Sequence, residues 1–383
     1  WVEMSIRLTM GATYTLLGMV REANEWLAQA GTGFHDCSDV FGETAVRLWR
    51  CLLWHQTEDE TRLKRDLEDL LPQISRHQFG FLFTQRTLLG PPDPRMLVPL
   101  LLFAREHSQH AAVAETLLAQ LGLTQLDLHP GYQLRVQTLG PFRIWLGAAE
   151  LSSKAWRRKK ARQLFQLLLT HRSTLLHRDQ IAEMLWPDLN PEGAVRDFKI
   201  AFSAMCSVLE PERKRNAPSA FVARDGSRYG LREEADIWLD TAVFEQNIDA
   251  GDQLYQQDVG RAVVEYETAV ALYEGDYLQA YPYESWSHEE RERLRARYLH
   301  TADRLAQWHA KQQDWGSVLS LCHAILQQDD CWENAYRLLM QAHIASGHRV
   351  QALRTYQRCE SALQAGLGVQ PALATMQLYE TIR

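Results

Sequence analysis

Residues 178–209, RDQIAEMLWPDLNPEGAVRDFKIAFSAMCSVL, contain two helical patterns separated by a turn. The first is a short amphipathic helix over 178–186 that ends at Pro187, because proline cannot continue the hydrogen bonding of a helix. The turn 188–191 leads to a longer helix over about 192–209. Apolar residues recur on this second helix at spacings of three and four, which predicts one buried stripe of Val195, Phe198, Phe202, Met205 and Leu209.

The opposite side of the longer helix is mostly polar, and it carries Arg196, Asp197, Lys199, Ile200 and Ser203. An apolar face packed on a domain and a polar face free for the major groove is the geometry of a DNA recognition helix. Any surface helix also has a polar face, so the pattern alone leaves this role open.

Strand patterns flank these helices. Residues 134–139 and 142–146 alternate apolar and polar around Gly140-Pro141, which predicts a short sheet. Downstream, 221–231 holds two strand-like runs around Asp-Gly, the signal of a β-hairpin. Arg224 and Arg228 flank the tip of this hairpin, so it is a candidate wing.

The segment 156–162, Trp-Arg-Arg-Lys-Lys-Ala-Arg, places five cations at the opening of a predicted helix with an apolar stripe at 164–168. Cations at a helix N-terminus oppose the helix dipole, which favours anions there. DNA phosphate would relieve this conflict. The alternative is a solvated helix start with no ligand.

Charge is sorted along the chain. Residues 134–232 hold 18 Lys and Arg against 9 Asp and Glu, whereas 1–133 hold 11 against 16 and 233–383 hold 12 against 23. A basic block of about a hundred residues is the electrostatic footprint of a nucleic-acid-binding domain. The alternative is that the basic block docks on its acidic neighbours. The acidic blocks would repel phosphate, so we expect them to serve another purpose.

The acidic blocks are helical. In 1–128, the segment 18–23 is typical of the tight turn of a tetratricopeptide-type (TPR) hairpin, and further helices are predicted over 97–105 and 111–121 after a break at 90–94. These features predict a helical-repeat scaffold. Three tryptophans of this block, Trp26, Trp49 and Trp54, could either line a ligand groove or pack in the core.

The last block, 236–383, repeats with the tetratricopeptide period of 34 residues, which separates Trp315 from Arg349 and Tyr298 from Trp332. Its charged run 289–295 alternates in sign, which predicts a solvated helix face with ion pairs between successive turns.

Four segments of the basic block resemble the DNA-binding domain of the antibiotic-pathway regulator (SARP) family: 139–142 (Leu-Gly-Pro-Phe), 156–159 (Trp-Arg-Arg-Lys), 185–188 (Leu-Trp-Pro-Asp) and 229–231 (Tyr-Gly-Leu). The resemblance implies a winged helix-turn-helix with an N-terminal sheet, its third helix in the major groove and its wing near the minor groove. The chain departs from the family pattern at three positions: Asp197 stands where an amide is usual, and Ala204 and Cys206 replace arginines.

The last block resembles the bacterial transcriptional activator domain that follows the winged helix in this family, at 236–240, 338–340, 352–356 and 366–371. Together the two resemblances cover about 134–383. The N-terminal helices are similar to the repeat domain found upstream of such modules in large regulators with a nucleotide-switch domain.

Several classes of protein lack support in the sequence. It contains no phosphate-loop motif, no H-E-x-x-H motif and no G-x-S-x-G motif, and its histidines stand singly, so we expect no enzyme, cofactor or metal. No apolar run approaches the length of a membrane span. The six cysteines are scattered, which favours the cytoplasm. The first residues have no signal-peptide pattern and no initiator Met, so we expect a piece of a longer protein.

We therefore expect a mainly α fold with a small β component, in which a winged helix-turn-helix domain (131–234) lies between two TPR-like helical domains (1–130 and 235–383). The expected function is a cytoplasmic, sequence-specific DNA-binding transcriptional activator, the C-terminal effector part of a larger signal-responsive regulator. Its expected partners are double-stranded promoter DNA, RNA polymerase, a second protomer on tandem sites, and a protein or small-molecule effector at the N-terminal helices.

The expected phosphate contacts come from the start of the first helix, from the first helix of the helix-turn-helix and from the wing, and the expected base contacts come from the longer helix. The residues are Arg157, Arg158, Lys159, Lys160, Arg178, Arg196, Asp197, Lys199, Ser203, Arg224 and Arg228. Two alternatives remain. One is an interaction scaffold whose winged helix binds DNA weakly or not at all, suggested by the three departures above. The other is a ligand-sensing repeat protein.

Overall fold

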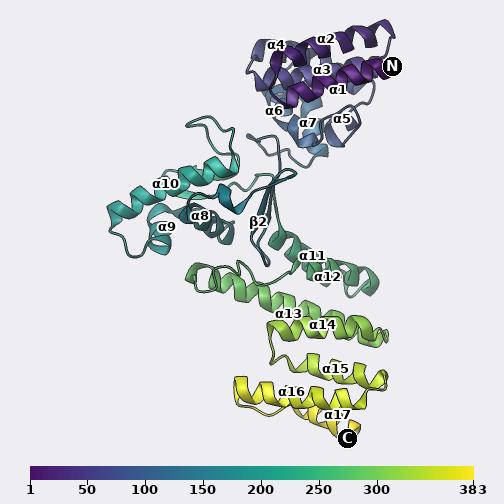
Figure 1. Ribbon diagram of the computed structural model, residues 1–383, viewed down its shortest axis with the longest axis vertical. Helices are drawn as coiled ribbons and strands as arrows, with labels where there is room; N and C mark the ends of the chain where they lie inside the picture. The colour runs from purple at the N-terminus through teal and green to yellow at the C-terminus, as the bar shows by residue number, and fades with distance from the viewer. The chain divides into compact units, whose positions relative to one another are not determined.

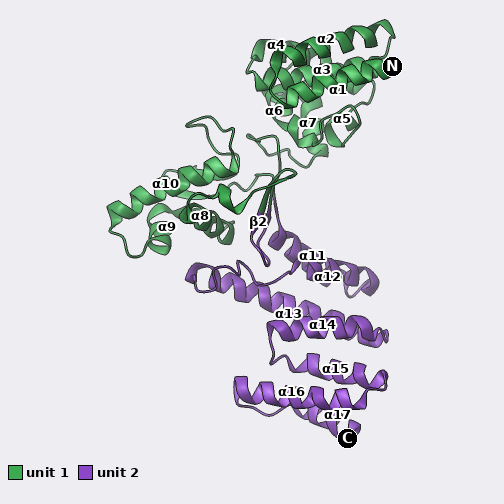
Figure 2. Ribbon diagram, in the orientation of Figure 1, with its two compact units in different colours: residues 1–135, 144–237 green, residues 136–143, 238–383 purple.

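The computed structural model describes residues 1–383 and is mainly helical, with two small sheets (Figure 1). It divides into two compact units, one of residues 1–135 and 144–237 and the other of residues 136–143 and 238–383 (Figure 2). The expected fold class is confirmed: along the chain, TPR-like helices precede and follow a winged helix-turn-helix. No helix is both long enough and apolar enough to cross a membrane.

The first four N-terminal helices each pack against the next in the chain, and the fourth also packs against the last two. The N-terminal helices are α1 (Val2–Leu16), α2 (Val20–Asp36), α3 (Val40–Gln56), α4 (Glu60–Arg76), α5 (Phe81–Thr84), the 3-10 helix η1 (Pro94–Leu97), α6 (Val98–His107) and α7 (Ala111–Gln120). The first four are each followed by a residue in the left-handed region, at intervals of twenty residues: Gly18, Ser38, Glu58 and Gln78. Such a residue reverses the chain and satisfies the last carbonyls of a helix.

Sequence analysis located only the first of these turns, because glycine signals a left-handed residue and serine, glutamate and glutamine do not. The helices that follow two of the turns begin with a side-chain cap. The carboxylates of Asp39 and Asp59 accept the backbone N–H of the residue three positions later.

Two of the tryptophans that could line a groove belong to the core. Trp49 and Trp54 are 2% and 3% exposed. The indole N–H of Trp49 donates to the Leu89 carbonyl at 2.7 Å, and that of Trp54 donates to the Asp66 carboxylate at 2.8 Å. Since both indoles are buried and hydrogen-bonded, a groove lined by Trp49 and Trp54 does not form, and packing is the correct alternative for them. Trp26 is half-buried.

The strands of the basic block are short: β1 (Leu134–Gln137), β2 (Arg143–Leu146), β3 (Ala149–Glu150), β4 (Leu176–His177), β5 (Val222–Asp225) and β6 (Arg228–Leu231). A further short strand, β7 (Ile237–Leu239), follows this block. Together these strands form sheets in the orders β3-β2-β1-β7 and β4-β6-β5. Strand β1 ends earlier than the alternation over 134–139 predicts. The backbone N–H groups of Thr138 and Leu139 donate instead to the buried Asp240 carboxylate, at 2.5 and 2.7 Å.

The helices of this block are η2 (Ser153–Ala155), α8 (Lys159–Thr170), α9 (Arg178–Leu185) and α10 (Pro191–Leu209), and α10 packs against both α8 and α9. Helix α10 begins at a side-chain cap, since the side-chain oxygen Oδ1 of Asn190 accepts the Gly193 N–H at 2.8 Å. Its predicted buried stripe is right at Phe198, Met205 and Leu209. Val195 and Phe202 are only half-buried, because Ala194 and Ala201 turn to the core and let the helices approach closely.

The second unit continues with α11 (Asp240–Leu254), α12 (Val259–Leu272), η3 (Ser285–Ser287), α13 (His288–Lys311), α14 (Trp315–Gln328), α15 (Glu333–Ala345), α16 (Arg349–Leu367) and α17 (Leu373–Ile382). The period of 34 residues is confirmed: α14 begins at Trp315 and α16 at Arg349. The left-handed residues before them, Gln313 and Gly347, have the same separation.

The charged run 289–295 is not a solvated face throughout. Arg291 is only 6% exposed, and its guanidinium donates to the carbonyls of Tyr277, Tyr281 and Pro282 at 2.9 Å each. It therefore holds the loop that precedes α13. Arg293 follows the prediction of exposed ion pairs and pairs with Glu290 at 2.7 Å.

Candidate nucleic-acid interface

A cleft of about 290 Å³ joins the start of α8 to the exposed side of α10. Arg158, Lys159 and Lys160 line it from α8, and Asp197 and Ala201 line it from α10. The structure therefore brings together two groups of residues that the sequence placed on separate helices.

The start of α8 has no side-chain cap and no acidic residue in its first turn. Its first N–H groups consequently lack the usual capping oxygen, and the helix dipole adds positive potential there. Arg157, Arg158 and Lys159 are exposed at this end. Lys160 differs, because it is half-buried and its ammonium donates to the Leu185 carbonyl at the end of α9. Lys160 thus also stabilises the fold.

The exposed face of α10 carries Arg196, Lys199 and Ser203, as the pattern predicts. Asp197 is half-buried, and its carboxylate accepts the Nε–H of Arg196 at 3.3 Å. Arg196 therefore offsets part of the negative charge that Asp197 would present to a phosphate. Ile200 adds an exposed apolar contact between the charged residues.

Ala204 and Cys206 stand where the family has arginines, which suggested that α10 lacks two exposed cations. The structure shows that the two positions differ in burial. Cys206 is 1% exposed, so it lies in the core, and burial raises the pKa of its thiol to about 12. The cysteine therefore removes nothing from the exposed face of α10. Ala204 is half-buried beside that face.

The hairpin of β5 and β6 turns at Gly226, whose positive φ of 56° favours glycine. Arg224 and Arg228 are exposed on its two strands. The guanidinium of Arg224 lies 5.7 Å from the Tyr229 ring, and its Nε donates to the Gly226 carbonyl at 3.3 Å. Tyr229 in turn contacts Phe198 on α10 edge to face, at 4.8 Å between ring centroids. The hairpin is thereby held against α10.

Arg178, at the first position of α9, connects this helix to the hairpin. Its backbone N–H donates to the Ser227 carbonyl at 2.8 Å. Its half-buried guanidinium pairs with the exposed carboxylate of Asp179 at 3.1 Å. Arg178 thus lies beside the hairpin tip, with a charge that is partly compensated by its neighbour.

Comparisons with known proteins agree with this architecture. Residues 239–383 match the sequence profile of the bacterial transcriptional activator domain. The chain is 25% identical over 256 residues to the regulatory protein AfsR of Streptomyces coelicolor, a match that covers 65% of this chain and 24% of AfsR. These matches agree with the resemblance of the chain to the SARP family, and residues 239–383 form a bacterial transcriptional activator domain.

A solved structure resembles this chain over a similar share of its length. Mycobacterium tuberculosis EmbR, in complex with a low-affinity phosphopeptide, matches with a TM-score of 0.53 and 18% identity, covering 66% of this chain and 65% of that chain. At this identity, the likeness supports the fold only. The chain spans about a quarter of the length of AfsR.

A second basic cavity, of about 860 Å³, was not predicted from the sequence. It lies among the second half of α10, the loop 213–219 and β5. Its cations are Arg213, Lys214, Arg215, Arg224 and Arg232. The signal was present as the run Arg-Lys-Arg at 213–215, which falls between predicted elements and so had no predicted position.

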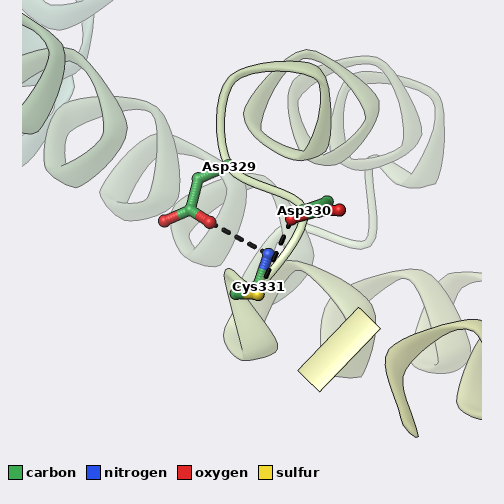
Figure 3. A group of neighbouring side chains, drawn as sticks. All are labelled: Asp329, Asp330 and Cys331. Atoms are coloured by element: carbon green, nitrogen blue, oxygen red, sulfur yellow. Dashed lines mark hydrogen bonds between the residues drawn. The ribbon is translucent and has the colours of Figure 1, made fainter. Parts of the chain in front are cut away.

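The turn between α14 and α15 holds a group of possible metal ligands, Asp329, Asp330 and Cys331 (Figure 3). The Asp329 carboxylate accepts the Cys331 N–H at 2.9 Å, and the Cys331 thiol lies 3.6 Å from Asp330. Burial, together with the Asp330 carboxylate, raises the pKa of the thiol. A protonated thiol is a poor metal ligand, and these hydrogen bonds are those of an ordinary turn.

Proposed function

We propose that this protein binds promoter DNA sequence-specifically, with α10 in the major groove and the β5–β6 hairpin beside the adjacent minor groove. The observation that carries the proposal is the cleft that joins the cationic start of α8 to the exposed face of α10. A recognition helix needs its base-contacting face next to groups that hold the DNA backbone, because backbone contacts fix its position on the duplex.

The proposed contacts divide by chemistry. Arg157, Arg158, Lys159 and Lys160 at the start of α8, with Arg178, Arg224 and Arg228 near the wing, hold phosphates and set affinity. Arg196 and Lys199 face base edges, where arginine and lysine favour guanine. Ser203 and Asp197 lie on the same helix, and a carboxylate at 197 favours a cytosine amino group.

We extend the proposal to the rest of the chain as domains 1–130, 131–234 and 235–383. The activator domain would pair protomers on tandem sites or contact RNA polymerase, and its profile match begins at residue 239. The N-terminal helices would receive a signal from a protein or small molecule within a larger regulator. Action on bacterial promoter DNA would take place in the cytoplasm.

The proposal is tested by fluorescence anisotropy of the full chain with short duplexes that cover the upstream regions of its own gene and its neighbours. The series is run at about 50 and about 200 mM salt, with a scrambled duplex of equal composition for comparison. We expect one or more upstream duplexes to bind more tightly than the scrambled one, and all binding to weaken with salt. Absence of binding to every duplex at the lower salt refutes the proposal and favours an interaction scaffold.

Two variants separate base contacts from phosphate contacts. Lys199→Ala should lose about 1 to 3 kcal/mol with the preferred duplex and less with the scrambled one, since base contacts carry the sequence preference. Arg158→Gln with Lys159→Gln should weaken both duplexes equally and make the salt dependence shallower by about 2. If Lys199→Ala leaves both affinities unchanged, α10 is not the recognition helix.

A further inference from the structure

Helix α10 has a cationic cavity on each side of its exposed ridge. Because an α-helix advances about 100° per residue, Asp197 and Ala201, which line the first cleft, lie on one flank of the ridge through Arg196 and Ser203. Residues 202 and 206, which line the second cavity, lie on the other flank. The polar face is thus bordered by positive charge on both sides.

The second cavity is formed by a loop with its own supporting bonds. Glu210, 5% exposed, accepts the Ala220 N–H at 2.7 Å and also the hydroxyl of Ser219. Arg213 donates to the Ala217 carbonyl, and Arg232 donates to the Ser219 carbonyl at 2.7 Å. Arg213 and Arg232 therefore shape the loop, and their charges are partly committed to it.

Two further cations of the loop, Lys214 and Arg215, are exposed at the rim of the cavity together with Arg224 of the wing. None of the residues that line the cavity is acidic. Lys214 pairs with Glu58 of the N-terminal helices at 2.7 Å, but both side chains are mostly exposed. Such a pair contributes little free energy, so a phosphate can replace the carboxylate.

We propose that Lys214, Arg215 and Arg224 hold the phosphates of one DNA strand, while the start of α8 holds those of the other. The two strands border the major groove, whose width of about 12 Å admits one helix. A helix lying in that groove therefore has a phosphate backbone on each side, which matches the two cavities. Ser203 and Ser207 also line the second cavity; the Ser207 hydroxyl donates to the Ser203 carbonyl at 2.9 Å, and the Ser203 hydroxyl can donate to phosphate. This inference rests on the proposed function.

The test uses the full chain with Lys214→Gln and Arg215→Gln, which leaves Arg213 and Arg232 in place to keep the loop folded. We expect the affinity for every duplex to fall at least tenfold at low salt, and the slope of log K against log salt to become shallower by about 2. The ratio between preferred and scrambled duplexes should not change. The matched control, Arg261→Gln with Arg354→Gln, removes the same charge from exposed positions of the activator domain and should keep the wild-type slope.

Ethylation of individual phosphates then identifies the strand. In the wild type, ethylation should interfere with binding on both strands of one major groove. The Lys214→Gln and Arg215→Gln double variant should lose interference on one strand. The Arg158→Gln and Lys159→Gln double variant should lose it on the other strand.

The inference is overturned if the wild type binds DNA and the variant at 214 and 215 keeps its slope, or if both variants lose interference on the same strand. It is also overturned if inorganic phosphate, titrated without DNA, protects the loop from proteolysis while the variant still binds DNA normally, because the cavity would then serve a small anion. If the wild type binds no DNA at all, the proposed function itself is wrong.

Discussion

Replacing Asp236 with Asn tests how the N-terminal helices are joined to the winged helix. The side chain of Asp236 is 7% exposed and lies just after the basic block, before β7. Its carboxylate accepts Nε of Arg95 at 2.5 Å and Nε2 of Gln133 at 2.7 Å, and Nε2 of His129 lies 3.4 Å away. One carboxylate therefore connects η1, the linker after α7 and the residue that precedes β1.

The size of the effect follows from the pKa of Asp236. Burial raises this pKa, but hydrogen bonds from His129, Gln133 and Arg95 outweigh burial and lower it from 3.8 to about 2. Since one pKa unit corresponds to about 1.4 kcal/mol, the ionised carboxylate stabilises the fold by about 2 kcal/mol. The folded-state pKa is the lower one, so this stabilisation is complete above about pH 4 and is lost as the pH falls towards 2.

The assay is urea unfolding of the full chain, followed by tryptophan fluorescence at several pH values. Asp236→Asn should lower the free energy of unfolding of the first transition by about 2 kcal/mol at pH 7, and by less as the pH falls below 4. Asp188→Asn, which removes an exposed carboxylate, is the control and should change little. Adding Arg95→Gln to Asp236→Asn should cost less than the sum of the two. A difference at pH 7 below about 0.5 kcal/mol, or one that does not shrink in acid, refutes the reasoning.

Two further predictions concern single contacts. Glu58→Gln frees Lys214 and should tighten DNA binding up to about fivefold at low salt, as expected from an exposed ion pair. Glu60→Gln, which removes an equal charge, is the control. Equal tightening by both variants would contradict a specific role for the ion pair. Arg291→Met leaves three carbonyls without their donor and should cost about 3 kcal/mol or more in the unfolding of the activator domain, measured calorimetrically. Arg354→Met should be close to neutral, and similar losses in both would contradict the role of Arg291.

Local patterns predicted the elements of the interface, because spacing and turn chemistry determine where a helix or hairpin forms. The helix α10 and the hairpin at Gly226 are examples, and both appear where the sequence places them. The depth of individual side chains was less predictable. Ala194 and Ala201 on α10 face the core of the domain, where the hydropathy pattern predicts Val195 and Phe202. Tight packing between helices selects small residues, and a hydropathy pattern does not distinguish these.

The departures from the family pattern illustrate the same limit. A sequence comparison treats positions 197, 204 and 206 alike, as lost or reversed polar groups. The structure separates them, because Cys206 is buried, Ala204 is half-buried and Asp197 is paired with Arg196. The loop 213–219 was unpredictable for another reason: its position depends on the buried carboxylate of Glu210, a contact between residues that no periodic pattern relates.

The cations of the basic block divide by role, and this division sets a measurable limit. Lys160, Arg213 and Arg232 donate to backbone carbonyls of their own domain, so their charges are partly committed to the fold. Arg178 is half-buried and paired with Asp179. The proposed phosphate contacts that are exposed, and that we count in full, are Arg157, Arg158, Lys159, Lys214, Arg215, Arg224 and Arg228. With about 0.9 counterion released per contact, seven contacts give a slope of log K against log salt of about −6 for one protomer. A slope near twice this value would mean that two protomers bind together, as occupation of tandem sites requires, whereas a slope well short of −6 would mean that one of the two cavities stays empty of phosphate.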